Sequence, residues 1–405
     1  MKKQKAIILA LATLATITAC DSSDAPLQHA DSYDYITFAA QPQRLLTRTN
    51  PYEAYDTQRH PSTMGTFGYY DLASATDLTA AAYCIFNNET TTYTAASAEW
   101  TTATRKRWSD YAKATSFDFF AYMPQAASAT LTRTAPSAYT LTLPFTMTVA
   151  QSSSDGVSSS DGTSMPVAPT PVILDTKAAP IICALPEHKE GKTASDGDFT
   201  FDRVINMQFD QTLTGYQLLF QLDPTMGAIR HFRIKSVTLS GQLPTSGTVS
   251  RTYSWSDSKK EWTADGIQWA GINRQSFDDS PFAIPYKNNT AANDNNTTVF
   301  DDDTKTAVVT NDDYTQWGPD FYTIPDAQFR PVISVTYDAE LKAEDSTTVV
   351  SRKDITSTIT LNKEKFSSLT TGKIAFINPI RILIQPRYLY VLADDDAYTG
   401  HLLIK

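Results

Sequence analysis

Two acidic triplets are the clearest groupings of side chains that could hold a metal ion. Asp301–Asp303 and Asp394–Asp396 offer carboxylate oxygens, the ligands that Ca²⁺ prefers. Neither triplet has the spaced ligands or the glycine turn of a calcium loop, so solvated acidic turns are the favoured interpretation. The five histidines are scattered and give no zinc-type spacing. The sequence therefore predicts no metal site and no cofactor.

Nucleophilic chemistry has equally weak support. The serines near Gly156 and Gly162 lie in a low-complexity stretch without a Gly-x-Ser-x-Gly elbow. Neither a phosphate-binding loop nor a dinucleotide fingerprint is present. A glycosidase site made of two carboxylates stays open as an alternative, because it depends on the distance between the two carboxyl groups in the folded protein, which the sequence does not give. We expect a protein that is not an enzyme.

The first twenty residues carry the strongest signal in the chain. Met1–Lys5 is basic, and Ala6–Thr18 is apolar but too short to be a permanent membrane span. The segment ends in Ile17-Thr18-Ala19-Cys20, which resembles a bacterial lipobox. Residues 1–19 are thus expected to be a lipoprotein signal peptide and Cys20 to carry acyl chains such as palmitate, each buried methylene contributing about 0.8 kcal/mol. The polar residues 20–31 are expected to be a flexible tether.

The two other cysteines, Cys84 and Cys183, lie in the apolar stretches AAYCIF and PIICAL. This context favours buried free thiols. A single disulfide stays open as the alternative, because an exported protein can form one.

Composition indicates an all-β fold. The chain has 405 residues, of which 19% are charged and 41% hydrophobic, and Thr, Tyr, Phe, Val and Ile recur in short runs broken by Pro, Gly, Asn and Asp. Similar numbers of strands in each half predict two β-sandwich domains, residues 32–228 and 229–405. A boundary in the 186–198 connector is the alternative. The net charge of −10 offers no basic face for nucleic acid.

Two of the predicted strands lie near the two ends of the chain. Residues 34–39 form the first strand, with either Tyr35 or Ile36 and Phe38 pointing inward. Near the other end, Tyr388, Tyr390 and Leu392 alternate with Leu389, Val391 and Ala393, so this strand is apolar on both faces. It could fold back into its own sheet or complete the sheet of a neighbouring molecule.

Several motifs together resemble the fimbrillin family of Bacteroidetes. They are DYITFAA, LLTRTN, FDFFAYMP, VINMQFDQTLTGYQLLFQL, IKSVTLSG and IRILIQPRYLYVL, and they span nearly all of the mature chain. The chain departs from the family pattern at Asp210-Gln211, where such proteins often have a histidine and a small residue. The resemblance implies two tandem transthyretin-like β-sandwiches and a subunit of type V pili that serves adhesion.

The resemblance also implies how such a subunit assembles. Fimbrillins are exported as lipoproteins, held at the outer membrane, and cut after an arginine by a trypsin-like protease at the cell surface. In this chain the arginine would be Arg48, with Arg44 as the alternative. The cut releases the first strand, and the C-terminal strand of the next subunit fills the groove. That donor strand would comprise Tyr388, Leu389, Tyr390, Val391, Leu392 and Ala393.

A second hypothesis is a surface lipoprotein that binds glycans and does not polymerise. Tryptophan rings can stack on sugars, and the candidates are Trp255, Trp262, Trp269 and Trp317. Core or edge packing is the more common use of such residues. The basic Arg105-Lys106-Arg107, which lies near Trp100 and Trp108, is interpreted as a solvated face.

Overall fold

The computed structural model describes fifteen stretches of the chain. They are residues 35–42, 61–75, 77–78, 82–95, 99–147, 172–173, 178–191, 204–222, 230–284, 300–301, 306–309, 315–342, 349–361, 377–385 and 388–391. The expected signal peptide, tether, Cys20, Arg44, Arg48, Leu392, Ala393 and the triplet Asp394–Asp396 lie outside them.

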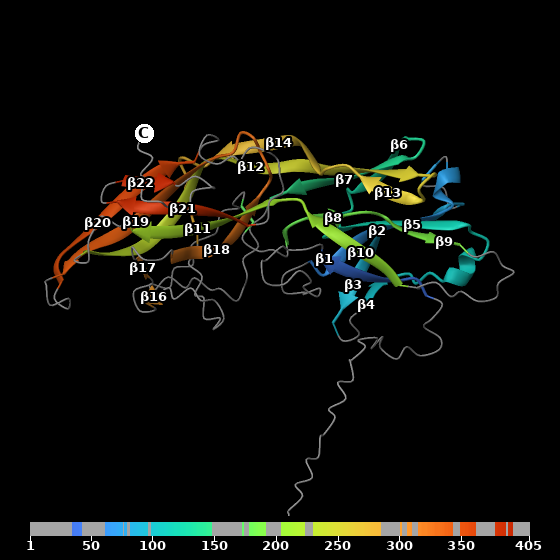
Figure 1. Ribbon diagram of the computed structural model, residues 1–405, viewed down its shortest axis with the longest axis horizontal. Coiled ribbons are helices and arrows are strands. Elements are labelled where there is room, and N and C mark those ends of the chain that lie inside the picture. Colours follow the sequence, from blue (N-terminus) through green and yellow to red (C-terminus); the bar gives the residue numbers. More distant parts are fainter. Residues whose placement is uncertain are drawn as a thin grey trace, which may run out of the picture.

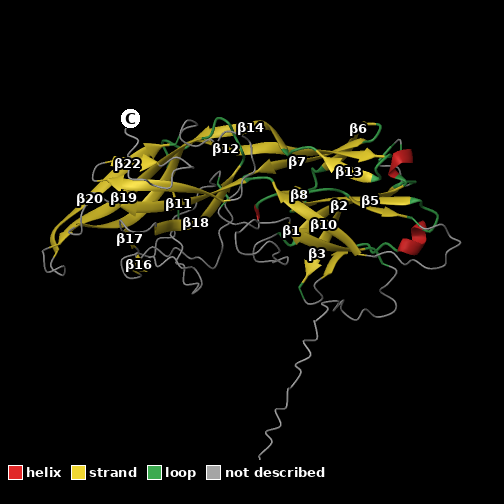
Figure 2. Cartoon of the chain, viewed as in Figure 1, coloured by secondary structure: helices red, strands yellow, loops and turns green. Residues whose placement is uncertain are grey.

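Within these stretches almost all regular structure is β-strand, and the two short 3-10 helices are the red segments of Figure 2. In chain order the elements are β1 (Thr37–Pro42), β2 (Thr63–Tyr70), η2 (Leu72–Ser74), β3 (Cys84–Thr94), β4 (Glu99–Thr102), η3 (Trp108–Tyr111), β5 (Ser116–Met123), β6 (Thr130–Ala135), β7 (Ala138–Thr146), β8 (Ile181–Cys183), β9 (Glu187–Glu190), β10 (Val204–Gln211), β11 (Thr214–Leu222), β12 (Arg230–Ser256), β13 (Glu261–Ala264), β14 (Gln268–Ser276), β15 (Phe282–Ala283), β16 (Phe300–Asp301), β17 (Thr306–Val309), β18 (Thr315–Thr323), β19 (Arg330–Lys342), β20 (Val349–Thr360), β21 (Ile377–Gln385) and β22 (Tyr388–Val391). The prediction of an all-β fold is confirmed, while the transthyretin-like assignment stays a prediction.

The first sheet closes on itself. Its strand order is β2-β3-β4-β1-β10-β8-β5, and β5 pairs again with β2, while β9 extends from β5. Closure leaves these seven strands with neighbours on both sides, which removes exposed edges. The first strand of the chain, β1, thereby occupies an interior position between β4 and β10.

A single long strand, β12, runs through both ends of the molecule (Figure 1). Its first part pairs with β19, β17 and β15, and its second part pairs with β14, β7 and β13. Near the point where the pairing changes, Gly241 has a φ of 90°, in the left-handed region that glycine tolerates. A separate four-stranded sheet has the order β18-β11-β21-β22.

The buried side chains form two large hydrophobic clusters. The first contains residues of β1 to β10 together with Val249, Tyr253 and Trp262. The second contains Val172 and residues of β11, β18, β19, β21 and the first part of β12. Strand β12 thus contributes side chains to both clusters. The domain division at residue 228 stays a prediction.

The cysteines of the described residues are free thiols. Cys183 is fully buried, and Cys84, at the start of β3, is half-buried. Burial raises the pKa of both thiols, although the charge of Lys106 opposes the shift at Cys84. The disulfide alternative is wrong for this pair.

Candidate strand-exchange site

The strand β1 is built into the first core. It runs parallel to β10 over its whole length, from Thr37 opposite Val204 to Pro42 opposite Phe209. It pairs antiparallel with β4 at Phe38 and Trp100. The ladder to β10 thus covers the whole strand, whereas the pairing with β4 is recorded at one residue pair.

The inward face of β1 consists of Ile36, Phe38 and Ala40, each at most 7% exposed. The Phe38 ring lies 5.7 Å from the Phe86 ring and 6.0 Å from the Phe119 ring, between centroids. The inward register that the sequence left open is thus the one with Ile36 and Phe38. Removal of β1 would leave the edges of β4 and β10 unpaired and an apolar slot beside these rings.

The residues just before β1 contact the basic tripeptide Arg105-Lys106-Arg107. Tyr35 forms an antiparallel bridge with Arg107, and the Ile36 N–H donates to the Lys106 carbonyl at 2.9 Å. The guanidinium carbons of Arg105 and Arg107 lie 5.3 Å and 5.0 Å from the centre of the Tyr35 ring. Arg107 Nη2 also donates to the Tyr35 hydroxyl at 3.1 Å. A segment expected to be a solvated face therefore binds the first strand, at cation–π distances.

At the other end of the chain, β22 is the outermost strand of its sheet. It pairs antiparallel with β21, from Gln385 opposite Tyr388 to Ile382 opposite Val391. The described part of the predicted donor strand therefore lies in the sheet of its own chain. Among the described strands, β22 has one paired neighbour, whereas β1 has two.

The four candidate tryptophans pack against protein groups. Trp262 and Trp317 are buried, and Trp255 and Trp269 are half-buried. The Trp255 ring lies 4.3 Å from the His188 ring and 5.3 Å from the Trp262 ring. Trp269 packs on Phe145 at 6.2 Å and donates its Nε1–H to the Thr212 carbonyl. These contacts occupy the rings and favour packing over the glycan hypothesis.

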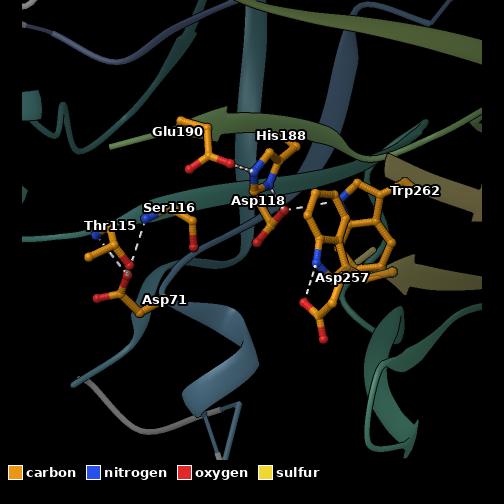
Figure 3. A network of polar contacts seen from close by, with 9 residues as sticks. Asp71, Thr115, Ser116, Asp118, His188, Glu190, Asp257 and Trp262 are labelled. Carbon is orange, nitrogen blue, oxygen red and sulfur yellow. Dashed lines mark hydrogen bonds and ion pairs between the residues drawn. The ribbon is translucent and has the colours of Figure 1, made fainter. Parts of the chain in front are cut away.

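A polar network lies beside Trp255 and Trp262 (Figure 3). Asp118 Oδ1 accepts from Trp262 Nε1 at 2.9 Å and lies 2.7 Å from His188 Nδ1. His188 Nε2 lies 3.5 Å from Glu190. Burial lowers the pKa of His188, but the hydrogen bonds and charges of Asp118 and Glu190 outweigh it and raise that pKa above its ordinary value. The network joins β5, β9 and β13, and sequence patterns gave no sign of it.

Neither a metal site nor a membrane-spanning helix occurs in the described stretches. No three histidine, cysteine, aspartate or glutamate side chains among them are grouped to hold a metal ion. None of their helices is both long enough and apolar enough to cross a membrane.

Comparison with known proteins gives matches among solved structures alone. No family model and no curated protein matches the chain. A fimbrial protein from Bacteroides vulgatus aligns over 88% of this chain and 97% of its own, at 14% identity and a TM-score of 0.41. The fimbrial anchor protein Mfa2 from Porphyromonas gingivalis aligns over 88% and 94%, at 9% identity and a TM-score of 0.28. Both of these solved structures are of fimbrial proteins.

Proposed function

We propose that the chain is a structural subunit of a cell-surface fimbria that polymerises by strand exchange and serves adhesion. It would be exported as a lipoprotein on Cys20, cut after Arg48 or Arg44, and joined to its neighbour through Tyr388–Ala393. The observation that carries the proposal is the interior position of β1 between β4 and β10. Strand β1 follows the expected tether of residues 20–31, and its inward side chains belong to the first core.

The position of the arginines relative to β1 supports the proposed cut. The strand ends at Pro42, and Arg44 and Arg48 follow within six residues. A cut after either arginine separates Ile36, Phe38 and Ala40 covalently from the rest of the core. The leader would then be held by the ladders and side-chain contacts of β1 alone, and it would take Cys20 and its acyl chains with it when it leaves.

The number of paired strand neighbours favours movement of the tail from its own sheet into the slot of β1. Within the part of the chain that the structure describes, β22 is the outermost strand of its sheet and has one strand neighbour. In the slot of β1 the same segment would have two, and alternate side chains would be buried at about 25 cal/mol per Å² of apolar surface. Each subunit would give its tail to one neighbour and accept the tail of another. This head-to-tail contact does not close, so it produces a filament.

The test is controlled trimming of the purified precursor with an arginine-specific protease. We expect a ladder of oligomers and a new N-terminus at Thr49, or at Leu45 if Arg44 is the site. Removal of residues 386–405 should leave the trimmed protein soluble and abolish the ladder. A trimmed protein that stays monomeric at high concentration, with its own tail paired to β21, would contradict the proposal.

A further inference from the structure

We infer that the tail replaces β1 residue for residue and in the same direction, with Tyr388–Ala393 taking the places of Tyr35–Ala40. This inference rests on the proposed strand exchange and specifies its register. The two segments read Tyr-Ile-Thr-Phe-Ala-Ala and Tyr-Leu-Tyr-Val-Leu-Ala. Both begin with tyrosine, continue with an aliphatic residue, and end with alanine.

The inward positions of β1 set the size that each replacing side chain must have. In this register Leu389 replaces Ile36 with nearly the same volume, and Ala393 replaces the buried Ala40 without change. Val391 replaces Phe38 and is smaller than the ring that packs on Phe86 and Phe119. Two of the three inward sites are therefore filled, and the third is left with a gap.

Other registers meet larger penalties. A shift of two residues in one direction would put Asp395 into the buried site of Ala40, and a shift in the other would put Arg387 into the site of Ile36. Each would bury an unpaired charge. A shift of one residue would turn Tyr388, Tyr390 and Leu392 inward and place a leucine at Ala40. Reversal of the strand would also place a leucine, Leu389, there.

The arginine pair at the entry favours the same register. Arg105 and Arg107 lie over the Tyr35 ring, and Arg107 donates to its hydroxyl. Once Tyr35 has left, these two cations fit an aromatic side chain at the first position of the incoming strand. Tyr388 supplies it in the stated register. The acceptor thus has two specificity-determining residues for a strand that begins with an aromatic residue.

Disulfide trapping tests the register. Ala39 lies opposite Asn206 in the parallel ladder, and Leu392 takes the place of Ala39 in the proposed register. In a Cys84→Ala background, the pair Ala39→Cys and Asn206→Cys is the geometric control, since its disulfide should keep the leader attached after trimming. The pair Leu392→Cys and Asn206→Cys should then give a covalent ladder after trimming. The pairs Tyr390→Cys or Asp394→Cys with Asn206→Cys should give none.

The outcomes separate the register from the proposed function. A covalent ladder from the 390 or 394 pair would overturn the stated register while strand exchange stands. Oligomers without a covalent ladder from any of the three pairs would overturn it as well, in favour of another face or direction. Trimmed protein that forms no oligomers at all would contradict the proposed function itself.

Peptide binding tests the arginine pair. The probe is a labelled peptide of residues 386–396 bound to the trimmed protein that lacks its own tail. Arg105→Ala or Arg107→Ala should speed dissociation of this peptide about two- to fivefold each, whereas Lys106→Ala, which removes the same charge without a ring contact, should not.

Altered peptides complete this test. A peptide with Tyr388→Leu should dissociate at the same rate from the parent protein and from the arginine variants, because it has no ring for the cations to contact. A peptide with Val391→Phe should dissociate more slowly than the unaltered one, because it fills the gap at the Phe38 site. Arginine changes that speed the dissociation of the unaltered peptide and of the Tyr388→Leu peptide equally would refute the role of the arginines.

Discussion

Asp118 is the residue at which three strands of the first core meet. It is 5% exposed, and its Oδ1 receives the Trp262 indole N–H while lying 2.7 Å from His188 Nδ1. A buried carboxylate is tolerated when such partners replace water. The contact between His188 and Asp118 therefore ties the outlying strand β9 to β5 on the side where β13 packs.

The first prediction concerns the pH dependence of stability at His188. Its pKa in the folded protein is raised above 6.5, so the protonated ring contributes stability that is fully present below 6.5. That contribution is lost as the pH rises through the raised pKa. His188→Gln should therefore lower the free energy of unfolding most at acidic pH, and the difference from the parent protein should shrink in alkali. Urea unfolding across this range measures it. A difference that does not change with pH would show that His188 acts through packing on Trp255 alone.

The second prediction concerns the ion pair between Arg274 and Asp326. Arg274 Nε and Nη2 lie 2.6 Å and 2.8 Å from the two carboxylate oxygens, and the Asp326 side chain is 2% exposed. Asp326→Ala would remove these hydrogen bonds and the acceptor of the Gln328 N–H, and should destabilise the fold by about 1.5–3 kcal/mol. Denaturant unfolding gives the value. Addition of Arg274→Ala should recover part of the loss, because the unpaired charge is gone; additive losses would contradict the coupling.

For single residues, the sequence predicted which side chains of a strand face inward, but it did not predict which distant residues they contact. The alternation of Leu141 and Leu143 with polar residues identified a strand whose leucines are buried. Arg107 and Tyr35, however, are 72 positions apart, and no pattern of residues indicates that they are in contact. Period-2 alternation reports which side of a strand faces inward. It carries no information on which distant strand lies opposite.

At the scale of elements, Gly241 lies where β12 passes from its pairing with β19 to its pairing with β14, within one ten-stranded sheet. Residues up to Gln242 pair with β19, and pairing with β14 begins at Gln242. Runs at residues 231–241 and 251–263 read from sequence as a strand and a separate hairpin. In the structure both runs belong to β12, and Gly241 keeps its place in the ladder with β19, opposite Pro331, at a φ of 90°.

The third prediction tests the role of Gly241. A Cβ at Gly241 would lie 2.3 Å from the Arg330 carbonyl oxygen of β19 and would also be strained at φ 90°. Gly241→Ala should therefore destabilise the fold by about 2–3 kcal/mol. The matched control is Gly271→Ala, which has a positive φ of 59° but no atom within 4 Å of its Cβ and should cost about 1 kcal/mol. Equal losses in thermal or urea unfolding would show that the contact with β19 is not the cause.

At the scale of the whole molecule, β12 couples the two cores. Its first part buries Ile234, Val237, Leu239 and Leu243 in the second cluster, and its second part buries Val249 and Tyr253 in the first. Similar strand numbers in each half pointed to a division at residue 228, and strand numbers cannot reveal that one strand contributes to both cores. The pairing of β12 with β7 joins residues about a hundred positions apart, which no local pattern signals.

The fourth prediction follows from this shared strand: both cores should unfold in one cooperative transition. Val249→Ala, in the first cluster, and Ile380→Ala, in the second, each remove a side chain that is at most 1% exposed and should cost about 2–3 kcal/mol. Either change should lower a single calorimetric midpoint, and circular dichroism and tryptophan fluorescence should report the same midpoint. Two resolved transitions, with each variant shifting one of them, would mean that the two ends of β12 melt independently.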